Sequence, residues 1–195
     1  MNQEQILDHF RQAGALLEGH FLLSSGLHSP VYLQCARVLQ NPGRAALLCK
    51  ALAKMVRDEI TGEVELVVSP ALGGVVVGYE MARQLGVEGI FTERVQGEIL
   101  LRRGFEIAPG TRVLMVEDVI TTGRSARECI ECIRTAGGNV VGAASLVNRS
   151  GGKADLGAPL VSLLQLDVPA YREEDLPDAL KAIPAVKPGS RNLKK

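Results

Sequence analysis

Two adjacent carboxylates, Glu117 and Asp118, follow an apolar run at residues 113–116 that predicts a buried strand. A carboxylate pair at such a position could accept hydrogen bonds from two neighbouring sugar hydroxyls. It could also stabilise positive charge that develops on a ribose ring carbon. If the pair only capped the next helix, its place at the end of an apolar strand would have no explanation. We therefore predict that Glu117 and Asp118 are the catalytic residues.

The residues that follow this pair have the composition of a phosphate-binding loop. Threonine and serine hydroxyls can donate hydrogen bonds, and Gly123 lets the backbone close around an oxyanion. A helix predicted from Ser125 adds free amides and the positive end of its dipole. Neither G-x-G-x-x-G nor G-x-x-x-x-G-K-[ST] occurs, which argues against dinucleotide-binding and P-loop sites. The predicted site for a sugar phosphate consists of Glu117, Asp118, Val119, Ile120, Thr121, Thr122, Gly123, Arg124 and Ser125.

Arg149 follows another predicted strand, at residues 140–147. Its planar guanidinium can bind a carboxylate through two parallel hydrogen bonds. A purine would offer it no such partner, so Arg149 favours an acidic base as the ligand. The alternative is an arginine that lies at the surface without a ligand.

Short β-branched runs alternate with helical patterns along most of the chain. Strands are expected at residues 31–33, 66–68, 89–91, 112–116 and 140–147, and helices at 4–15, 42–59, 74–85 and 125–135. This alternation predicts an α/β protein whose parallel sheet is covered by helices on both faces. Ligands bind such sheets beyond the carboxyl ends of the strands, where the loops after Val68, Val116 and Val147 are expected.

Residues 98–107 interrupt this alternation, because apolar flanks enclose the sequence Arg102-Arg103-Gly104. The pattern predicts a β-hairpin or flap beside the sheet. Arg102 and Arg103 could supply positive charge to a departing anion, or they could simply be solvated.

The composition is that of one domain with a sizeable core. Of the 195 residues, 46% are hydrophobic, and 22 basic side chains balance 22 acidic ones. A net charge of zero excludes an overall basic field for nucleic acid and mildly favours self-association. No apolar run reaches the ~18 residues of a membrane span, and no secretory signal is visible, so we expect a cytoplasmic protein.

The cysteines and one histidine are expected to be structural. Cys35, Cys49, Cys129 and Cys132 should be reduced thiols in such a compartment. Cys129 and Cys132 form a C-x-x-C inside a predicted helix, which favours buried thiols over a redox or metal role. His28 could contact a substrate, although a hydrogen-bonded loop histidine is favoured.

Residues 113–125 resemble the phosphoribosyl diphosphate signature of the type I phosphoribosyltransferases, in which two acidic residues precede a threonine-rich loop. The resemblance extends over about residues 4–180. It implies one domain with a parallel five-stranded central sheet flanked by helices, a mobile β flap and a small hood. The hood would comprise about residues 1–37 and 160–195, and the core about residues 38–159. The resemblance also implies a homodimer, and Mg²⁺ held mainly by substrate oxygens and water rather than by a protein cage.

Within that family the chain is similar to the orotate phosphoribosyltransferases. Residues 24–32, S-S-G-L-H-S-P-V-Y, resemble their hood segment, and Asn148-Arg149 follows a strand where their orotate-binding arginine stands. The implied reaction transfers the 5-phosphoribosyl group from phosphoribosyl diphosphate to orotate, giving orotidine 5′-phosphate and pyrophosphate in the synthesis of UMP. The implied contacts are Thr121 and Arg149 for orotate, Ala71, Leu72, Gly73 and Gly74 for pyrophosphate, and Arg94, Arg102 and Arg103 for the flexible loop.

Two positions depart from the pattern of the orotate enzymes. Ser24 stands where many of them have lysine, and residues 93–98, E-R-V-Q-G-E, keep only Arg94 from a loop that otherwise carries several lysines and a histidine. The depleted loop keeps a non-catalytic binding protein as an alternative. Transfer to a purine such as adenine or xanthine is a second alternative, and a ligand-sensing regulator that binds RNA or DNA is a third.

Overall fold

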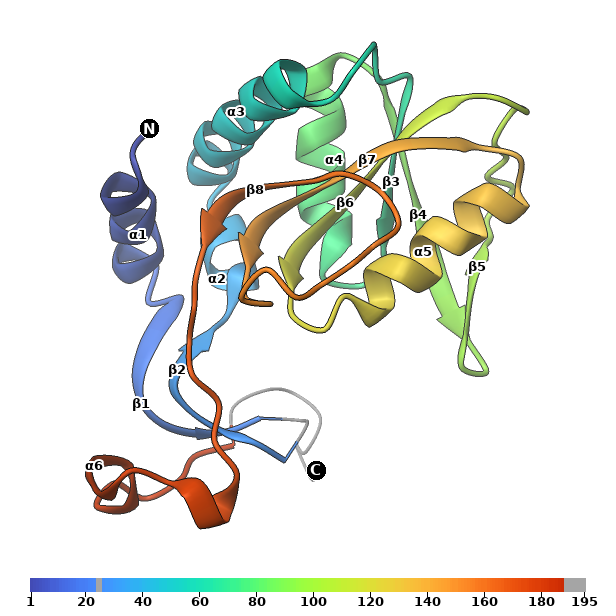
Figure 1. Cartoon of the computed structure of the whole chain (residues 1–195). Coiled ribbons are helices and arrows are strands. Elements are labelled where there is room, and N and C mark those ends of the chain that lie inside the picture. The colour runs from blue at the N-terminus through green and yellow to red at the C-terminus, as the bar shows by residue number, and fades with distance from the viewer. Residues whose placement is uncertain (24–25, 188–195) are drawn as a thin grey trace.

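The computed structural model describes residues 1–23 and 26–187, which include a six-stranded central sheet (Figure 1). Its strands are β3 (Leu66–Pro70), β4 (Glu88–Val95), β5 (Glu98–Leu101), β6 (Arg112–Ile120), β7 (Asn139–Asn148) and β8 (Leu160–Gln165). They lie in the order β5-β4-β3-β6-β7-β8. Neighbours among β4, β3, β6, β7 and β8 are parallel, whereas β5 is antiparallel to β4. The predicted α/β fold with five parallel strands is confirmed, and one antiparallel edge strand is added to it.

Helices cover both faces of this sheet (Figure 1). The helical segments are α1 (Gln3–Gln12), α2 (Cys35–Leu39), α3 (Pro42–Glu59), α4 (Gly74–Leu85), α5 (Arg124–Thr135), the short η1 (Glu173–Asp175) and α6 (Asp178–Lys181). Strand β6 shows the two layers, because Leu114 and Val116 belong to the core formed with α3 and α4. Val113 and Met115 belong to the core formed with α5. Alternate side chains of one strand therefore fill two cores, as expected for a sheet buried on both sides.

The predicted helix boundaries agree with the structure where a capping residue marks them. The side chain of Asn41 accepts a hydrogen bond from the amide of Arg44 at 3.0 Å, and Pro42 occupies the first turn of α3. The first helix is shorter than expected, because it ends at Gln12 and the chain turns through Gly14, whose φ is 58°. Strand β1 (Leu16–Leu22), which follows, was not predicted.

A separate two-stranded hairpin joins β1 to β2 (His28–Leu33) and lies with the C-terminal segment away from the sheet (Figure 1). The two histidines of the hairpin are buried and face each other, with His20 Nε2 2.6 Å from His28 Nδ1. The other ring nitrogen of His20 donates to the carbonyl of Ile183 at 2.7 Å. His28 is thus a hydrogen-bonded structural residue, as favoured from the sequence. These contacts tie the two ends of the chain together.

The predicted C-terminal boundary of the hood, at about residue 160, does not coincide with a boundary in the structure. Residues 160–165 form β8, which is the last strand of the central sheet. A hood would therefore draw its C-terminal part from residues after β8, and the division into hood and core stays a prediction. Ser24, which replaces the lysine of many orotate enzymes, lies outside the described residues.

The flap exists, but its turn is not where the sequence analysis placed it. Strands β4 and β5 pair antiparallel from Thr92↔Leu101 to Val95↔Glu98, so the turn is formed by Gln96 and Gly97. Both have positive φ values, 51° and 97°, as two-residue hairpin turns often require. The turn predicted at 102–104 was wrong, because residues 102–107 form no strand that could pair with β5.

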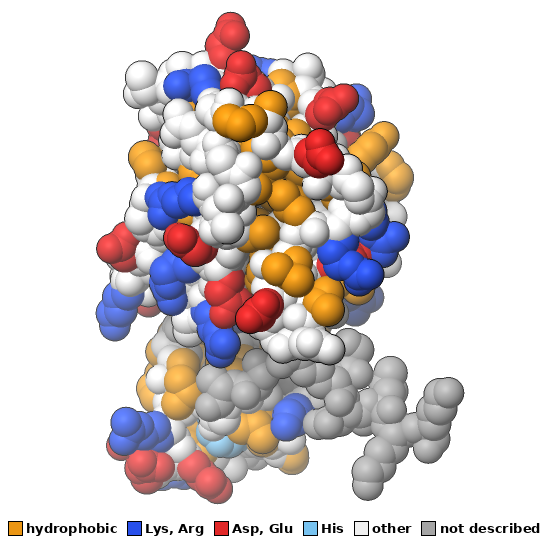
Figure 2. All heavy atoms as spheres, turned by 90° about the vertical axis from the view of Figure 1, so that its right-hand side faces the viewer, with side chains coloured by type: hydrophobic (Ala, Val, Ile, Leu, Met, Phe, Trp, Pro, Cys, Tyr) orange, Lys and Arg blue, Asp and Glu red, His pale blue; other side chains and the backbone are white. Residues whose placement is uncertain are grey.

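The surface near the flap carries charges of both signs. Seen from the side of β5 and α5, Lys and Arg side chains alternate with Asp and Glu around a band of hydrophobic side chains (Figure 2). This mixture agrees with the net charge of zero. Among residues 1–23 and 26–187, no helix combines the length and hydropathy needed to cross a membrane.

Candidate active site

The acidic pair lies within β6, and not in a loop after it. β6 pairs with β3 only up to Met115, opposite Val68, whereas it pairs with β7 as far as Ile120. The last residues of β6, after Met115, are therefore unpaired on the side that faces β3. β3 leads into α4 on one face of the sheet, and β6 leads into α5 on the other. Parallel sheets form their ligand crevice at such a reversal.

A cavity of about 320 Å³ occupies this position. The turn between β3 and α4 lines one side of it, and side chains from β4, β5, β6 and α5 line the other. The lining consists of Pro70, Ala71, Gly73, Gly74, Arg94, Ile99, Glu117, Asp118 and Ser125. The structure thus brings together three of the predicted groups: the acidic pair, the glycine turn and Ser125, the last residue of the predicted phosphate site. A larger, open hollow of about 600 Å³ lies at the opposite end of the strands, near Val64 and Val87, away from these groups.

The glycine turn approaches the acidic pair closely. A Cβ atom on Gly73 would lie 3.0 Å from Asp118 Oδ1, and one on Gly74 would lie 3.1 Å from Pro70 Cδ. A larger residue at position 73 would push the turn away from the carboxylate, and one at position 74 would press against Pro70 and Ser69. The peptide bond between Ala71 and Leu72 is cis, and the Leu72 side chain is 86% exposed. Of the four predicted pyrophosphate residues, Ala71, Gly73 and Gly74 line the cavity, whereas Leu72 does not.

Burial changes the acidity of both carboxylates. It raises the pKa of Glu117 to about 8, and the neighbouring Asp118 adds to this rise. Burial also raises the pKa of Asp118, although hydrogen bonds from backbone amides oppose it. One of these is donated by Val119 to Asp118 Oδ1 at 2.9 Å. Carboxylates that are desolvated in a crevice, with little to neutralise them, are typical of functional sites.

The phosphate loop joins β6 to α5 and leaves the helix N-terminus open. Gly123 has a φ of 73°, and a Cβ atom there would lie 2.7 Å from Leu156 Cδ2, so only glycine fits. No side chain caps α5, which begins at Arg124. The amide of Arg124 donates to Thr122 Oγ1 over a long 3.4 Å. The amides that follow it in the first turn are available to an anion, together with the exposed hydroxyl of Thr121. Ile120, by contrast, is fully buried and serves the core.

Arg149 begins the turn after β7 and lies where the hairpin meets the sheet. Its amide donates to the carbonyl of Ile120 at 2.7 Å, which places it beside the phosphate loop. Its guanidinium donates to the carbonyl of Val31 over a long 3.5 Å, and its Nε is buried without a hydrogen-bond partner. Burial lowers the pKa of this guanidinium. Among the described residues no carboxylate pairs with Arg149, so it is a partly buried cation suited to an anionic ligand.

Comparisons with known proteins agree with the interpretation of this cavity as a phosphoribosyl-binding site. A family model of the phosphoribosyl transferase domain matches residues 35–171. The chain is 59% identical over 194 residues to the orotate phosphoribosyltransferase of Phenylobacterium zucineum, with 100% of both chains covered. It is 55% identical over 193 residues to that of Parvibaculum lavamentivorans, covering 99% of this chain and 100% of the relative. This chain belongs to the orotate phosphoribosyltransferase family.

Solved structures of the family share the fold. Orotate phosphoribosyltransferase from Aeropyrum pernix superposes with a TM-score of 0.67 at 28% identity, covering 82% of this chain and 93% of that one. The Mycobacterium tuberculosis enzyme in complex with inorganic phosphate gives a TM-score of 0.67 at 27% identity, covering 84% and 95%. Adenine phosphoribosyltransferase from Saccharomyces cerevisiae, at 19% identity and a TM-score of 0.62 over 81% and 99%, shares the fold alone.

Of the three arginines predicted for the flexible loop of this family member, Arg94 reaches the cavity. It extends from β4 and lines the cavity together with the acidic pair. Arg102 and Arg103 instead form ion pairs with Glu93, and they are not among the residues that line the cavity. The roles of all three remain predictions, and Arg94 is the one of the three that lines the cavity.

Mg²⁺ fits the donor atoms of the cavity. Glu117 and Asp118 provide carboxylate oxygens there, and Mg²⁺ prefers oxygen ligands. Within residues 1–23 and 26–187 there is no cluster of three or more His, Cys, Asp or Glu side chains that could hold a metal by itself. A bound Mg²⁺ would therefore depend on substrate oxygens for the rest of its coordination.

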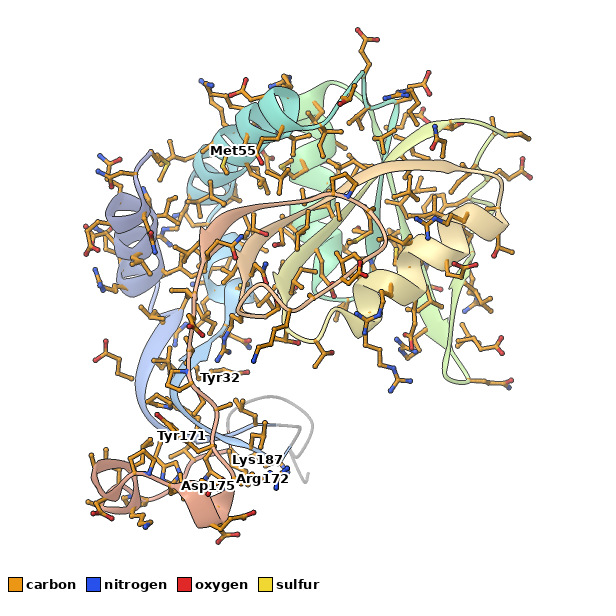
Figure 3. All side chains as sticks on the ribbon, in the orientation of Figure 1. Tyr32, Met55, Tyr171, Arg172, Asp175 and Lys187 are labelled. Atoms are coloured by element: carbon orange, nitrogen blue, oxygen red, sulfur yellow. The ribbon has the colours of Figure 1, made fainter. Side chains whose placement is uncertain are left out.

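Several residues near the site were missed in the sequence analysis. Tyr32 lies on the part of the hairpin nearest the sheet and interacts electrostatically with Arg149 (Figure 3). Cys35 is buried, and its Sγ donates to the carbonyl of Asp118 at 3.8 Å. Tyr32 could have been singled out as the aromatic residue of the hood segment. Cys35 and Glu128, an α5 residue that pairs with Arg94, carry no sequence signal, because only the packing brings them to the site.

Proposed function

We propose that this chain transfers the 5-phosphoribosyl group from phosphoribosyl diphosphate to orotate, producing orotidine 5′-phosphate and pyrophosphate in the synthesis of UMP. One observation carries the proposal: a desolvated acidic pair lies in one cavity with a glycine turn and the open N-terminus of α5. That arrangement suits a sugar with an anion at each end. Identities of 55% and 59% to orotate phosphoribosyltransferases support the choice of orotate.

In the proposed reaction, a ring nitrogen of orotate displaces pyrophosphate from the anomeric carbon. The carbon–oxygen bond breaks ahead of bond formation, so positive charge grows on the ribose ring. Glu117 and Asp118 would accept hydrogen bonds from the sugar hydroxyls and stabilise that charge. The amides and hydroxyls between Thr121 and Ser125 would hold the 5-phosphate. The contribution of the protein is to position the reactants and to compensate charge, rather than to form a covalent intermediate.

The leaving group and the acceptor would lie apart, with pyrophosphate in the cavity and orotate beside it. Pyrophosphate would lie against the turn at Gly73 and Gly74, with Arg94 beside it. Orotate would lie toward the hairpin, where Arg149 would bind its carboxylate and Thr121 would contact the base. Mg²⁺, when bound, would neutralise pyrophosphate and favour its departure. The flap formed by β4 and β5 would help to exclude water from the activated sugar.

The charge of the acidic pair would respond to substrate. Burial raises the pKa of Glu117 to about 8, so the pair in the free protein carries less negative charge at neutral pH than two exposed carboxylates would. Less repulsion then opposes the entry of a polyanionic substrate. Positive charge on the ribose would favour the ionised forms, so the pair would be most negative when the reaction needs it.

Release of pyrophosphate with different acceptor bases tests the proposal. The purified protein, with phosphoribosyl diphosphate and Mg²⁺, is incubated with orotate, adenine or xanthine. We expect turnover with orotate alone. Turnover with a purine would reassign the acceptor. Binding of phosphoribosyl diphosphate without turnover on any base would point to a regulator or a binding protein.

We also propose that the chain forms a homodimer, as the family resemblance implies. Leu72, Val76 and Tyr79 are 86%, 50% and 71% exposed, and Val76 and Tyr79 lie on one side of α4. Exposed apolar side chains that cluster in this way often mark a protein interface. The cluster begins at the glycine turn, so a second copy seated here would lie beside the cavity.

A further inference from the structure

Glu128 of α5 joins two arginines that come from different elements, the flap strand β4 and the first turn of α5. Its Oε2 accepts from Arg94 Nη2 of the flap strand β4. Its Oε1 accepts from Arg124 Nε, at the start of α5, at 2.8 Å. The flap is therefore connected to the phosphate loop through a single carboxylate. Glu128 does not itself line the cavity.

The contacts of Arg94 fix the direction of its side chain. Arg94 Nη1 donates to the carbonyl of Gly97 at 2.5 Å, while Nη2 donates to Glu128. A guanidinium is planar, so acceptors on two of its nitrogens determine its orientation. While held in this way, Arg94 still lines the cavity. Its side chain is 39% exposed and that of Glu128 is 30%, so the ion pair is only partly exposed to solvent.

We propose that Glu128 is a positioning residue, which holds Arg94 at the pyrophosphate end of the cavity and couples the flap to the phosphate loop through Arg124. The inference rests on the proposed function, because it assigns Arg94 to the departing pyrophosphate. A cation that is oriented before the substrate arrives loses little freedom when it binds, and it stabilises negative charge more effectively than a mobile one.

Glu128 should also have a second effect, which opposes the binding of pyrophosphate. A carboxylate near an anion-binding cavity repels pyrophosphate, so removing its charge alone would tighten binding. The two arginines offset this repulsion, and they also lower the pKa of Glu128, which keeps the carboxylate ionised at neutral pH. If Glu128 acts by positioning Arg94, Glu128→Gln should lower turnover. If it acts only through its charge, the same substitution should tighten the binding of pyrophosphate.

The experiment is a double-mutant cycle on the full-length protein, with orotate, phosphoribosyl diphosphate and Mg²⁺. Glu128→Gln is measured alone and in an Arg94→Ala background, and Glu131→Gln serves as the matched control because Glu131 is an exposed residue of the same helix. We expect Glu128→Gln to lower kcat about tenfold in the native background and less than about twofold in the Arg94→Ala background. Glu131→Gln should leave turnover unchanged, and the melting temperatures of the Glu128 and Glu131 variants should agree.

Three outcomes would overturn the inference. An equal loss in both backgrounds would mean that Glu128 does not act through Arg94. Tighter binding of Mg²⁺–pyrophosphate in both backgrounds, disappearing at high salt, would mean that only its charge matters. Unchanged kcat in an active enzyme would mean that it has no role. Absence of turnover by the wild-type protein is a separate result, because it would contradict the proposed function itself.

Discussion

At the scale of single residues, the site combines ionisable groups whose burial is unfavourable for the free protein. Glu117 and Asp118 are desolvated, and Arg149 is partly buried without a carboxylate partner among the described residues. Each arrangement destabilises the fold when considered alone, since buried charges need a partner. A ligand with hydroxyls, phosphates and a carboxylate would supply those partners. These residues are thus better explained by a ligand than by stability.

Replacing Asp118 with asparagine should separate catalysis from folding. We expect kcat to fall at least about 100-fold, because the neutral amide cannot stabilise positive charge on the sugar. Stability should change little, since an amide oxygen can still accept the hydrogen bond from Val119 at 2.9 Å. Steady-state kinetics and thermal melting provide the two measurements. A parallel loss of stability and activity would assign Asp118 a structural role instead.

Glu117 should make the stability of the free protein depend on pH. Its pKa is about 8 when folded, against an ordinary value of 4.5, so the folded state binds a proton that the unfolded state has lost. Stability is therefore lost as the pH rises from about 4.5 to about 8. Glu117→Gln removes this loss. The free energy of unfolding of the variant, relative to that of the wild type, should therefore grow by about 1–3 kcal/mol between pH 5 and pH 8.5.

Urea unfolding of both proteins at the two pH values measures that difference. Glu131→Gln is again a suitable control, because Glu131 is exposed on α5. A difference between wild type and Glu117→Gln that stays constant with pH would show that the carboxyl is not desolvated in the folded protein.

At the scale of elements, close packing between α4 and β3 positions the pyrophosphate turn. Gly78 of α4 lies directly over Ser69, and a Cβ atom there would lie 2.5 Å from Ser69 Oγ and 2.8 Å from Ser69 Cβ. The helix can therefore approach the strand only because residue 78 has no side chain. Since α4 begins at Gly74, any shift of this helix moves the wall of the cavity.

Gly78→Ala should consequently weaken both the fold and substrate binding. We expect a loss of about 1–3 kcal/mol in the free energy of unfolding, as is typical of overpacked contacts, and a higher KM for phosphoribosyl diphosphate. Gly43→Ala in α3 is the matched control, because its nearest neighbour would be Asn41 Oδ1 at 3.4 Å and alanine favours helix. If the two variants had equal stability and equal KM, the close contact at Gly78 would have no such role.

At the scale of the whole molecule, two distant parts of the chain meet beside the site. The β1–β2 hairpin pairs with the C-terminal segment through bridges between Phe21 and Val186 and between His28 and Tyr171. Tyr171, Arg172, Asp175 and Lys187 gather in this region, while Tyr32 lies toward the sheet (Figure 3). The hairpin also brings the carbonyl of Val31 to Arg149. The surroundings of Arg149, where we propose that orotate binds, are therefore built from segments that are far apart in sequence.

The proposed homodimer predicts a concentration-dependent mass of twice 20.8 kDa in sedimentation velocity. Tyr79→Asp should shift the protein toward the monomer, because it places a charge among the exposed apolar residues of α4. Ile183→Asp is a control, since Ile183 is 45% exposed in the C-terminal segment, away from α4. A dimer that survives Tyr79→Asp would place the interface elsewhere, and a wild-type monomer would contradict the proposal.

The order of local patterns along the chain was enough to determine the layers of the fold and the site's central motif. Runs of β-branched residues predicted the buried parallel strands, because both faces of such a strand need apolar side chains. Asn41 and Pro42 predicted the start of α3, since capping depends on neighbouring residues only. The acidic pair and its hydroxyl-rich loop were recognisable for the same reason, as their chemistry lies within nine consecutive residues.

Tertiary structure alone decided which cation reaches the cavity and what lies beside Arg149. Sequence spacing could not separate Arg94 from Arg102 and Arg103, because their positions depend on a hairpin turn that formed at Gln96 and Gly97. Nor could it indicate that Glu128 pairs with Arg94, since 34 residues separate the two. Such contacts arise where the end of β6 is unpaired and distant segments pack around it. They could not be predicted, because long-range packing leaves no periodic pattern in the sequence.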